Sequence, residues 1–158
     1  MSEAAELELV KAHSAATDKY IYFLLAAAGA SIAFALSQTK GAALSPWQAP
    51  LGAAVLCWAA SFYSGCARLR SLSQHIYLNV ELLKVLGGRH ELTGQHPQLI
   101  AVAQQSTMES LKSESDAGAR WATWQFRLLL LGAGLYVVWH VAEMYLRAID
   151  TRGGDWAG

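Results

Sequence analysis

The sequence predicts an all-α integral membrane protein with three transmembrane helices, at least two of which extend into a cytoplasmic helical stalk. Three observations lead to this prediction: 54% of the residues are hydrophobic, only 15% are charged, and the apolar residues cluster in three blocks. In water-soluble domains about a quarter of the residues are charged, and apolar residues recur as periodic stripes. We therefore expect a chain that lies largely in lipid.

The three apolar blocks cover residues 20–37, 47–65 and 126–146. Each is close to the ~20 residues that a helix needs to cross a bilayer. The first block contains no charged residue. In the second block, Trp47 and Tyr63 lie near the ends, where aromatic side chains favour the membrane interface. We expect each block to form one transmembrane helix.

The distribution of basic residues predicts the orientation of these spans. The side with the N-terminus and the 66–125 connection carries nine Lys and Arg residues, whereas the opposite side carries Lys40, Arg147 and Arg152. Basic residues close to a span are retained in the cytoplasm. We therefore expect a cytoplasmic N-terminus in the inner (plasma) membrane of a bacterium. The C-terminal residues 147–158 are then a flexible tail on the periplasmic or extracellular side.

Residues 1–19 are predicted to extend the first helix into the cytoplasm. Apolar and small residues recur there at spacings of three and four, as on a helix face that packs against a partner. Ser2 is well placed to cap the start of this helix. The residues of the expected packing face are Leu7, Val10, Ser14, Thr17, Ile21 and Leu24.

Residues 66–125 are predicted to form a cytoplasmic helical hairpin. Gly87 and Gly88 end the helix that continues the second span, and Pro97 suits the first turn of the next helix. No proline follows, so this last helix should be about 50 residues long and include the third span. The expected packing faces are Leu69, Leu72, Ile76, Val80 and Leu83 on the first arm, and Ile100, Ala103, Thr107, Leu111, Gly118 and Trp121 on the second.

His140 and Glu143 are the most informative polar residues of the third span. They are three residues apart and so share one helix face. If the helix enters the bilayer near Trp121 and Trp124, this pair is a polar patch at the far interface. If it enters near Arg127, both side chains lie within the membrane, where ionisable groups line cavities or pathways. In an oligomer the pair would then form a ring at an outer pore mouth, an arrangement that favours cations.

Small residues at four-residue spacing on the first two spans predict close helix contacts in lipid. Three helices per chain cannot use all of these faces internally, so we expect a homo-oligomer. Ser31 and Gln38 on the first span are then further candidates for a polar lining. The small residues predicted to pack helices are Gly29, Ala33, Ala53, Cys57, Ser61 and Gly65.

Several classes of function have no support in the sequence. The net charge of zero gives no electrostatic footprint for nucleic acid. There is no phosphate-binding loop, nucleophile elbow or metal-binding helix motif, so we expect neither an enzyme nor a cofactor, and a membrane metalloenzyme is only a distant third possibility. Cys57 and Cys66 are nine residues apart on one helix, too far to bridge, so both should be free thiols.

The functional hypothesis is a homo-oligomeric ion channel or pore with a cytoplasmic helical stalk, in contact with membrane lipid. The alternative is a non-conducting scaffold or accessory subunit that recruits a protein partner through its cytoplasmic helices. Two spans followed by a cytoplasmic helix are similar to the small two-span effectors beside bacterial nucleotide-signalling defence systems. The third span departs from that pattern.

Overall fold

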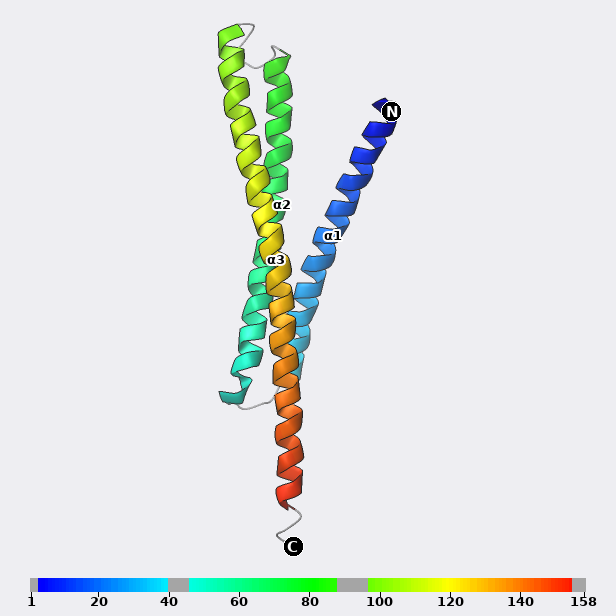
Figure 1. Ribbon diagram of the computed structural model, residues 1–158, viewed down its shortest axis with the longest axis vertical. Helices are drawn as coiled ribbons and strands as arrows, with labels where there is room; N and C mark the ends of the chain where they lie inside the picture. Colours follow the sequence, from blue (N-terminus) through cyan, green and yellow to red (C-terminus); the bar gives the residue numbers. More distant parts are fainter. Residues whose placement is uncertain (1–2, 40–45, 88–96, 155–158) are drawn as a thin grey trace. The chain divides into compact units, whose positions relative to one another are not determined.

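The computed structural model describes residues 3–39, 46–87 and 97–154, and these residues form helices without any β-strand (Figure 1). The helices are α1 (Glu3–Gln38), a short 3-10 helix η1 (Pro46–Gln48), α2 (Ala49–Leu86) and α3 (Pro97–Gly154). All three α-helices are long and apolar enough to cross a membrane. The prediction of an all-helical chain with three candidate spans is confirmed.

The sequence explains where the helices begin and end. Pro97 is the first residue of α3, a position where its missing N–H group would have had no helical partner anyway. At the end of α2, the Gly87 amide donates a hydrogen bond to the Leu83 carbonyl at 3.0 Å, so the helix stops at the predicted glycine. The capping role expected for Ser2 lies outside the described residues.

α3 is 58 residues long, which exceeds the expected length of about 50. It continues through Gly154, so the tail predicted to begin at residue 147 is helical as far as 154. The reason is that residues 147–152 contain neither proline nor glycine, and extending an existing helix is far easier than starting one. Figure 1 shows this end of α3 (red) projecting past α1 and the start of α2. Residues 155–158 lie outside the described residues.

The chain divides into two compact units, one formed by residues 1–63 with 125–158 and the other by residues 64–124. In the first unit all three helices contribute to one core. Its buried centre is formed by Ala35 from α1 and by Leu51, Ala54 and Trp58 from α2. The half-buried residues around this centre are Ile32, Val55, Leu129, Leu135, Tyr136 and Trp139.

Side chains of α2 donate hydrogen bonds to backbone carbonyls of α3 in the first unit. The Ser61 hydroxyl donates to the Gln125 carbonyl at 2.7 Å, and the Trp58 indole donates to the Leu129 carbonyl at 3.3 Å. Gly132 lies against the same indole, and a Cβ atom there would be 2.6 Å from its Nε1. These contacts determine the register of the two helices.

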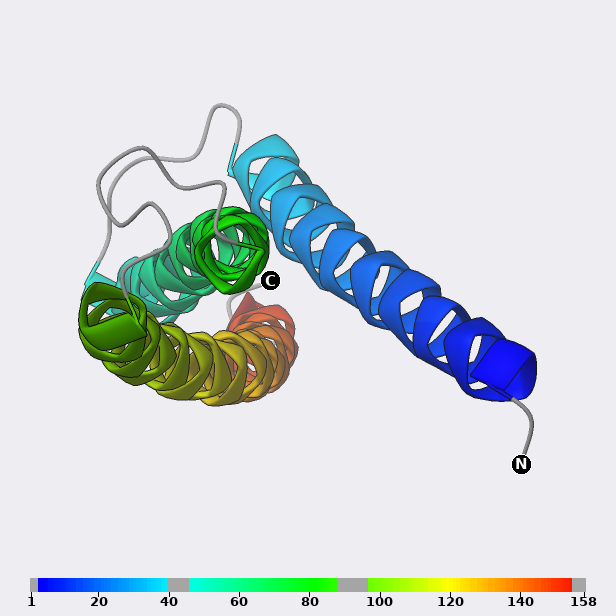
Figure 2. The same ribbon diagram turned by 90° about the horizontal axis from the view of Figure 1, so that it is seen from above.

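The second unit is an antiparallel hairpin made by the end of α2 and the beginning of α3, which lie side by side in Figures 1 and 2. The buried Ser71 hydroxyl lies 2.8 Å from the Glu114 carbonyl oxygen and 2.7 Å from the Glu114 carboxylate. Val85 is buried near the end of α2. The six residues predicted as the packing face of the second arm are all half-buried, as expected.

The packing face predicted for the first arm is only partly present, because Leu69 and Leu72 are half-buried but the other three residues are not. Ile76, Val80 and Leu83 are 65%, 46% and 64% exposed. The side of α2 that meets α3 carries Ser71 instead. The Ser71 hydroxyl can bond a carbonyl of the neighbouring helix, whereas a larger apolar side chain would hold the two backbones apart. We call the exposed residues Ile76, Val80 and Leu83 the α2 stripe.

The packing face predicted near the start of α1 is only partly present. Ile21 and Leu24 are buried, Thr17 is half-buried and Ser14 is exposed. The Thr17 hydroxyl donates to the His13 carbonyl at 3.0 Å, so it bonds to its own helix rather than to a partner. The side chains of Leu7 and Val10 lie outside the described part of the chain.

Candidate functional site

A polar pocket of about 190 Å³ lies in the first unit, where the end of α1, η1 and the last third of α3 meet. We call it the first-unit pocket. It brings together three of the four residues predicted to line a pore: Gln38, His140 and Glu143. Its full lining is Gln38, Thr39, Gln48, Trp139, His140, Glu143, Met144 and Arg147.

Glu143 is paired within its own helix. The Arg147 guanidinium donates to Glu143 Oε1 from Nε at 3.2 Å and from Nη2 at 3.1 Å. The two residues are one helical turn apart, and the Arg147 side chain is 78% exposed. An exposed pair of this kind stabilises a helix by only about 0.3–0.5 kcal/mol. It nevertheless neutralises the one carboxylate that lines this pocket.

The rings of Trp139 and His140 line the first-unit pocket and belong to a larger cluster of aromatic side chains. The His140 ring stacks on Tyr136, with ring centroids 6.1 Å apart and planes at 11°. Tyr136 also contacts Phe34, Trp58 and Trp139, at centroid distances of 5.7–6.0 Å. The indole Nε1 of Trp139 is buried and has no hydrogen-bond partner. The pocket therefore combines a stacked imidazole with an unused N–H donor.

The remaining polar residues predicted on α1 are arranged differently. Ser31 is half-buried and does not line the pocket. Ser37 donates to the Phe34 carbonyl at 2.7 Å, and Thr39 donates to the Leu36 carbonyl at 3.1 Å. Both hydroxyls thus bond carbonyls near the end of their own helix, and the Leu36 carbonyl belongs to the last turn, where helical N–H donors run out. Only Gln38 and Thr39 of this group reach the pocket.

The small residues predicted to pack helices fall into three groups. Ser61 and Gly65 are buried, and Ser61 contacts α3 through its hydrogen bond. Gly29, Ala53 and Cys57 are half-buried, and a Cβ on Gly29 would meet no atom within 4 Å. Ala33 is exposed. A role for Gly29 and Ala33 in contacts with another copy stays a prediction.

Two residues that shape the first unit were not predicted. Gly132 lies against Trp58 and the Ala54 carbonyl of α2, and Gln125 is fully buried with both side-chain amide atoms unpartnered. One signal identifies them in the sequence: they continue the 3.5-residue spacing that runs through Gly118 and Trp121.

Cys57 and Cys66 are free thiols in the structure, in agreement with the sequence. Within residues 3–39, 46–87 and 97–154, no group of three His, Cys, Asp or Glu side chains is placed to hold a metal ion. His90 and His96 lie outside these ranges. Comparisons with protein-family models, curated proteins and solved structures returned no match for this chain.

Proposed function

We propose that the protein is a membrane-inserted homo-oligomeric ion channel or pore with a cytoplasmic helical stalk. The observation that carries the proposal is the first-unit pocket, where Gln38, His140 and Glu143 meet at one end of an apolar bundle. Polar and ionisable groups are costly at membrane depth unless they face a partner, a cavity or water. A pore mouth shared by several copies would provide such a setting.

The surface of the three helices supports insertion into lipid. Large apolar side chains are exposed along every candidate span, among them Phe23 and Phe34 on α1, Leu56 on α2, and Val137 and Val141 on α3. A water-soluble monomer rarely exposes apolar surface on this scale. Lipid or neighbouring copies would cover it.

The Glu143–Arg147 pair sets an expectation for selectivity. A ring of bare carboxylates attracts cations, but here each carboxylate has a guanidinium 3.1 Å away. We therefore expect weak discrimination between cations and anions in the unmodified protein. Replacing Arg147 with Gln would leave Glu143 unpaired and shift the selectivity toward cations.

Flux measurements in liposomes test this proposal. The purified protein should conduct monovalent ions, Glu143→Gln and His140→Ala should change the flux, and Arg147→Gln should raise the ratio of cation to anion flux. Val141→Ala is the matched control, because Val141 is an exposed apolar residue between the two candidates. Absence of flux from protein that is folded and oligomeric would refute the channel proposal.

A second candidate is a non-conducting scaffold, which the α2 stripe favours. Ile76, Val80 and Leu83 present an exposed apolar surface on a hairpin that also carries many charged residues. Such a surface suits a protein partner. A stable co-purifying protein, lost on substitution of Ile76 and Leu83 and accompanied by absence of flux, would favour the scaffold over the channel.

A further inference from the structure

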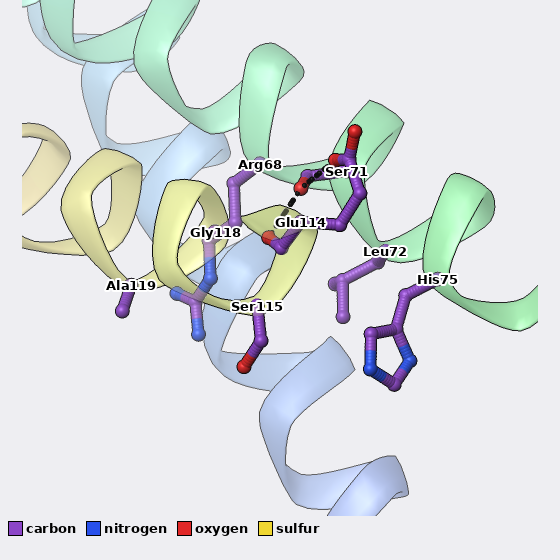
Figure 3. Close-up of a pocket in the computed structure, with 8 residues that line it drawn as sticks. All are labelled: Arg68, Ser71, Leu72, His75, Glu114, Ser115, Gly118 and Ala119. Carbon is purple, nitrogen blue, oxygen red and sulfur yellow. Dashed lines mark hydrogen bonds between the residues drawn. The ribbon is translucent and has the colours of Figure 1, made fainter. Parts of the chain in front are cut away.

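A second pocket, of about 320 Å³, lies within the second unit between α2 and α3 (Figure 3). We call it the second-unit pocket. α2 contributes Arg68, Ser71 and His75 to it, and α3 contributes Glu114 and Ser115. Small residues of α3 leave the space open: at Gly118 even an added Cβ would approach the Ser71 hydroxyl only to 3.8 Å. The pocket is therefore a recess in the hairpin whose lining includes charged and polar side chains.

Arg68 is the unusual group in this recess. Its Nη1 atom is buried and has no hydrogen-bond partner, although a guanidinium is always charged and carries five N–H donors. A buried charge without a partner is unfavourable, because it loses its hydration and gains nothing in return. Within the described residues, Nη1 of the Arg68 guanidinium thus lacks an acceptor.

Glu114, the one acidic residue that lines the pocket, does not meet this need. Its carboxylate Oε2 accepts a hydrogen bond from the Ser71 hydroxyl at 2.7 Å, and it forms no ion pair with Arg68. Figure 3 shows the Glu114 carboxylate beside Ser71, while the Arg68 guanidinium extends toward Gly118 and Ala119. The cationic part of the recess is separate from its acidic part.

Two further donors line the pocket. The Asn79 side-chain nitrogen lies 3.0 Å from His75 Nδ1, and in the tautomer whose Nδ1 accepts this bond the ring N–H is on Nε2. His75 can therefore offer an N–H donor. The Ser115 hydroxyl is exposed and lines the same recess. Arg68, His75 and Ser115 therefore bring three potential donors to one recess.

The position of Arg68 along α2 indicates where the anion comes from. No Asp, Glu, Lys or Arg occurs between Ala49 and Ala67, so Arg68 is the first charged residue of the helix. At 1.5 Å per residue this uncharged segment is roughly 28 Å long, close to the ~30 Å hydrocarbon thickness of a bilayer. In an inserted protein Arg68 would lie at the level of the lipid phosphates.

We propose that the second-unit pocket binds the phosphate group of an anionic lipid headgroup, with Arg68 as its main ligand and His75 and Ser115 as further donors. The planar guanidinium matches two oxygens of a phosphate at once, which a point charge cannot do. Basic recesses at the cytoplasmic ends of membrane helices are suited to such headgroups. The site does not depend on whether the protein conducts ions.

Lipid binding to the full chain tests the proposal. The purified protein in mild detergent is titrated with phosphatidylglycerol, phosphatidylcholine or inorganic phosphate, and bound lipid is counted by native mass spectrometry alongside the melting temperature. We expect phosphatidylglycerol to bind and raise the Tm, and Arg68→Gln to weaken this binding about tenfold or more, the scale of one charge-assisted hydrogen bond. Arg68→Lys should bind phosphatidylglycerol more tightly than Arg68→Gln but less tightly than the unmodified protein.

Arg70→Gln is the matched control, because Arg70 is an exposed arginine two residues away on the same helix and the charge change is identical. It should bind phosphatidylglycerol as the unmodified protein does. Ser115→Leu, which fills the pocket without removing charge, should weaken binding and so covers the case in which Arg68→Gln fails to fold.

If Arg68→Gln and Arg70→Gln weakened phosphatidylglycerol binding equally, the binding would depend on general surface charge alone, and the proposal would be overturned. Equal binding of phosphatidylcholine and phosphatidylglycerol would overturn it as well. If inorganic phosphate alone produced the full rise in Tm, the lipid assignment would be wrong and the site would belong to free phosphate.

Discussion

Gly132 controls how closely α2 and α3 approach in the first unit. A Cβ at this position would lie 2.6 Å from Trp58 Nε1 and 3.1 Å from the Ala54 carbonyl oxygen. Neither atom can yield easily, because the indole is buried in the core and the carbonyl belongs to the helix backbone. The glycine is thus required for contact rather than for backbone freedom.

We expect Gly132→Ala to lower the free energy of unfolding by about 1–3 kcal/mol, the cost of overfilling a packed core. Gly134→Ala is the matched control, since a Cβ there meets no atom within 4 Å. It should leave stability unchanged or raise it by up to about 1 kcal/mol through higher helix propensity. Unfolding in detergent, followed by circular dichroism, measures both variants, and equal stability of the two would contradict the assigned contact.

At the level of elements, α2 and α3 are matched through hydroxyl and indole donors that reach backbone carbonyls of the opposite helix. In the second unit this role belongs to Ser71, which is buried against Glu114. A side-chain donor is effective here because the bond is formed in a partly buried setting where water competes poorly. Polar contacts therefore join the two helices of the hairpin in addition to apolar packing.

We expect Ser71→Ala to loosen the hairpin by about 1.5–3 kcal/mol, because it removes a donor from a carboxylate and leaves that group without a partner. Hydrogen–deuterium exchange should become faster in residues 64–86 and 97–124. Ser73→Ala is the control, since the Ser73 hydroxyl is exposed and bonds only the Leu69 carbonyl of its own helix at 3.1 Å. Comparable exchange in the two variants would show that the contact between helices is not stabilising.

The α2 stripe is a face of one helix that the hairpin leaves exposed. Replacing Ile76 and Leu83 with Glu places charge on this face. If the stripe mediates assembly, the double substitution should lower the subunit number or release a bound partner, as measured by native mass spectrometry. Substitution of the exposed polar residues Ser73 and Gln74 with Glu is the control and should leave the assembly unchanged.

For the whole molecule, the main open prediction is the direction in which the helices cross the membrane. Nine Lys and Arg residues on one side against three on the other predict a cytoplasmic N-terminus. A cysteine in place of Ser73 would report on this directly, because Ser73 is exposed and lies five residues beyond Arg68 on the side predicted to be cytoplasmic.

In Ser73→Cys protein without Cys57 and Cys66, a membrane-impermeant maleimide should therefore fail to label position 73 in intact cells and should label it after permeabilisation. Thr39→Cys in a background without Cys57 and Cys66 is the control, and it should be labelled from outside. The reverse pattern of labelling would invert the orientation and move the second-unit pocket to the opposite leaflet.

The sequence by itself determined the helical class, the number of candidate spans and the end of α2 at Gly87. These features follow from local properties: long uncharged apolar runs, the absence of proline within them, and the conformational freedom of glycine. They need no knowledge of which helix lies beside which. Two residues of the first-unit pocket could be predicted in the same way, because helical spacing alone places His140 and Glu143 on one face.

Only the tertiary structure decided which face of each helix packs. On α2 both the stripe with Ile76 and the side with Ser71 have helical periodicity, and a sequence pattern favours the more apolar one. The structure buries Ser71, because its hydroxyl finds a carbonyl on α3. The same holds for Gly132 and Arg68: the role of each depends on a neighbour more than 40 residues away in sequence, which periodicity along a single helix does not specify.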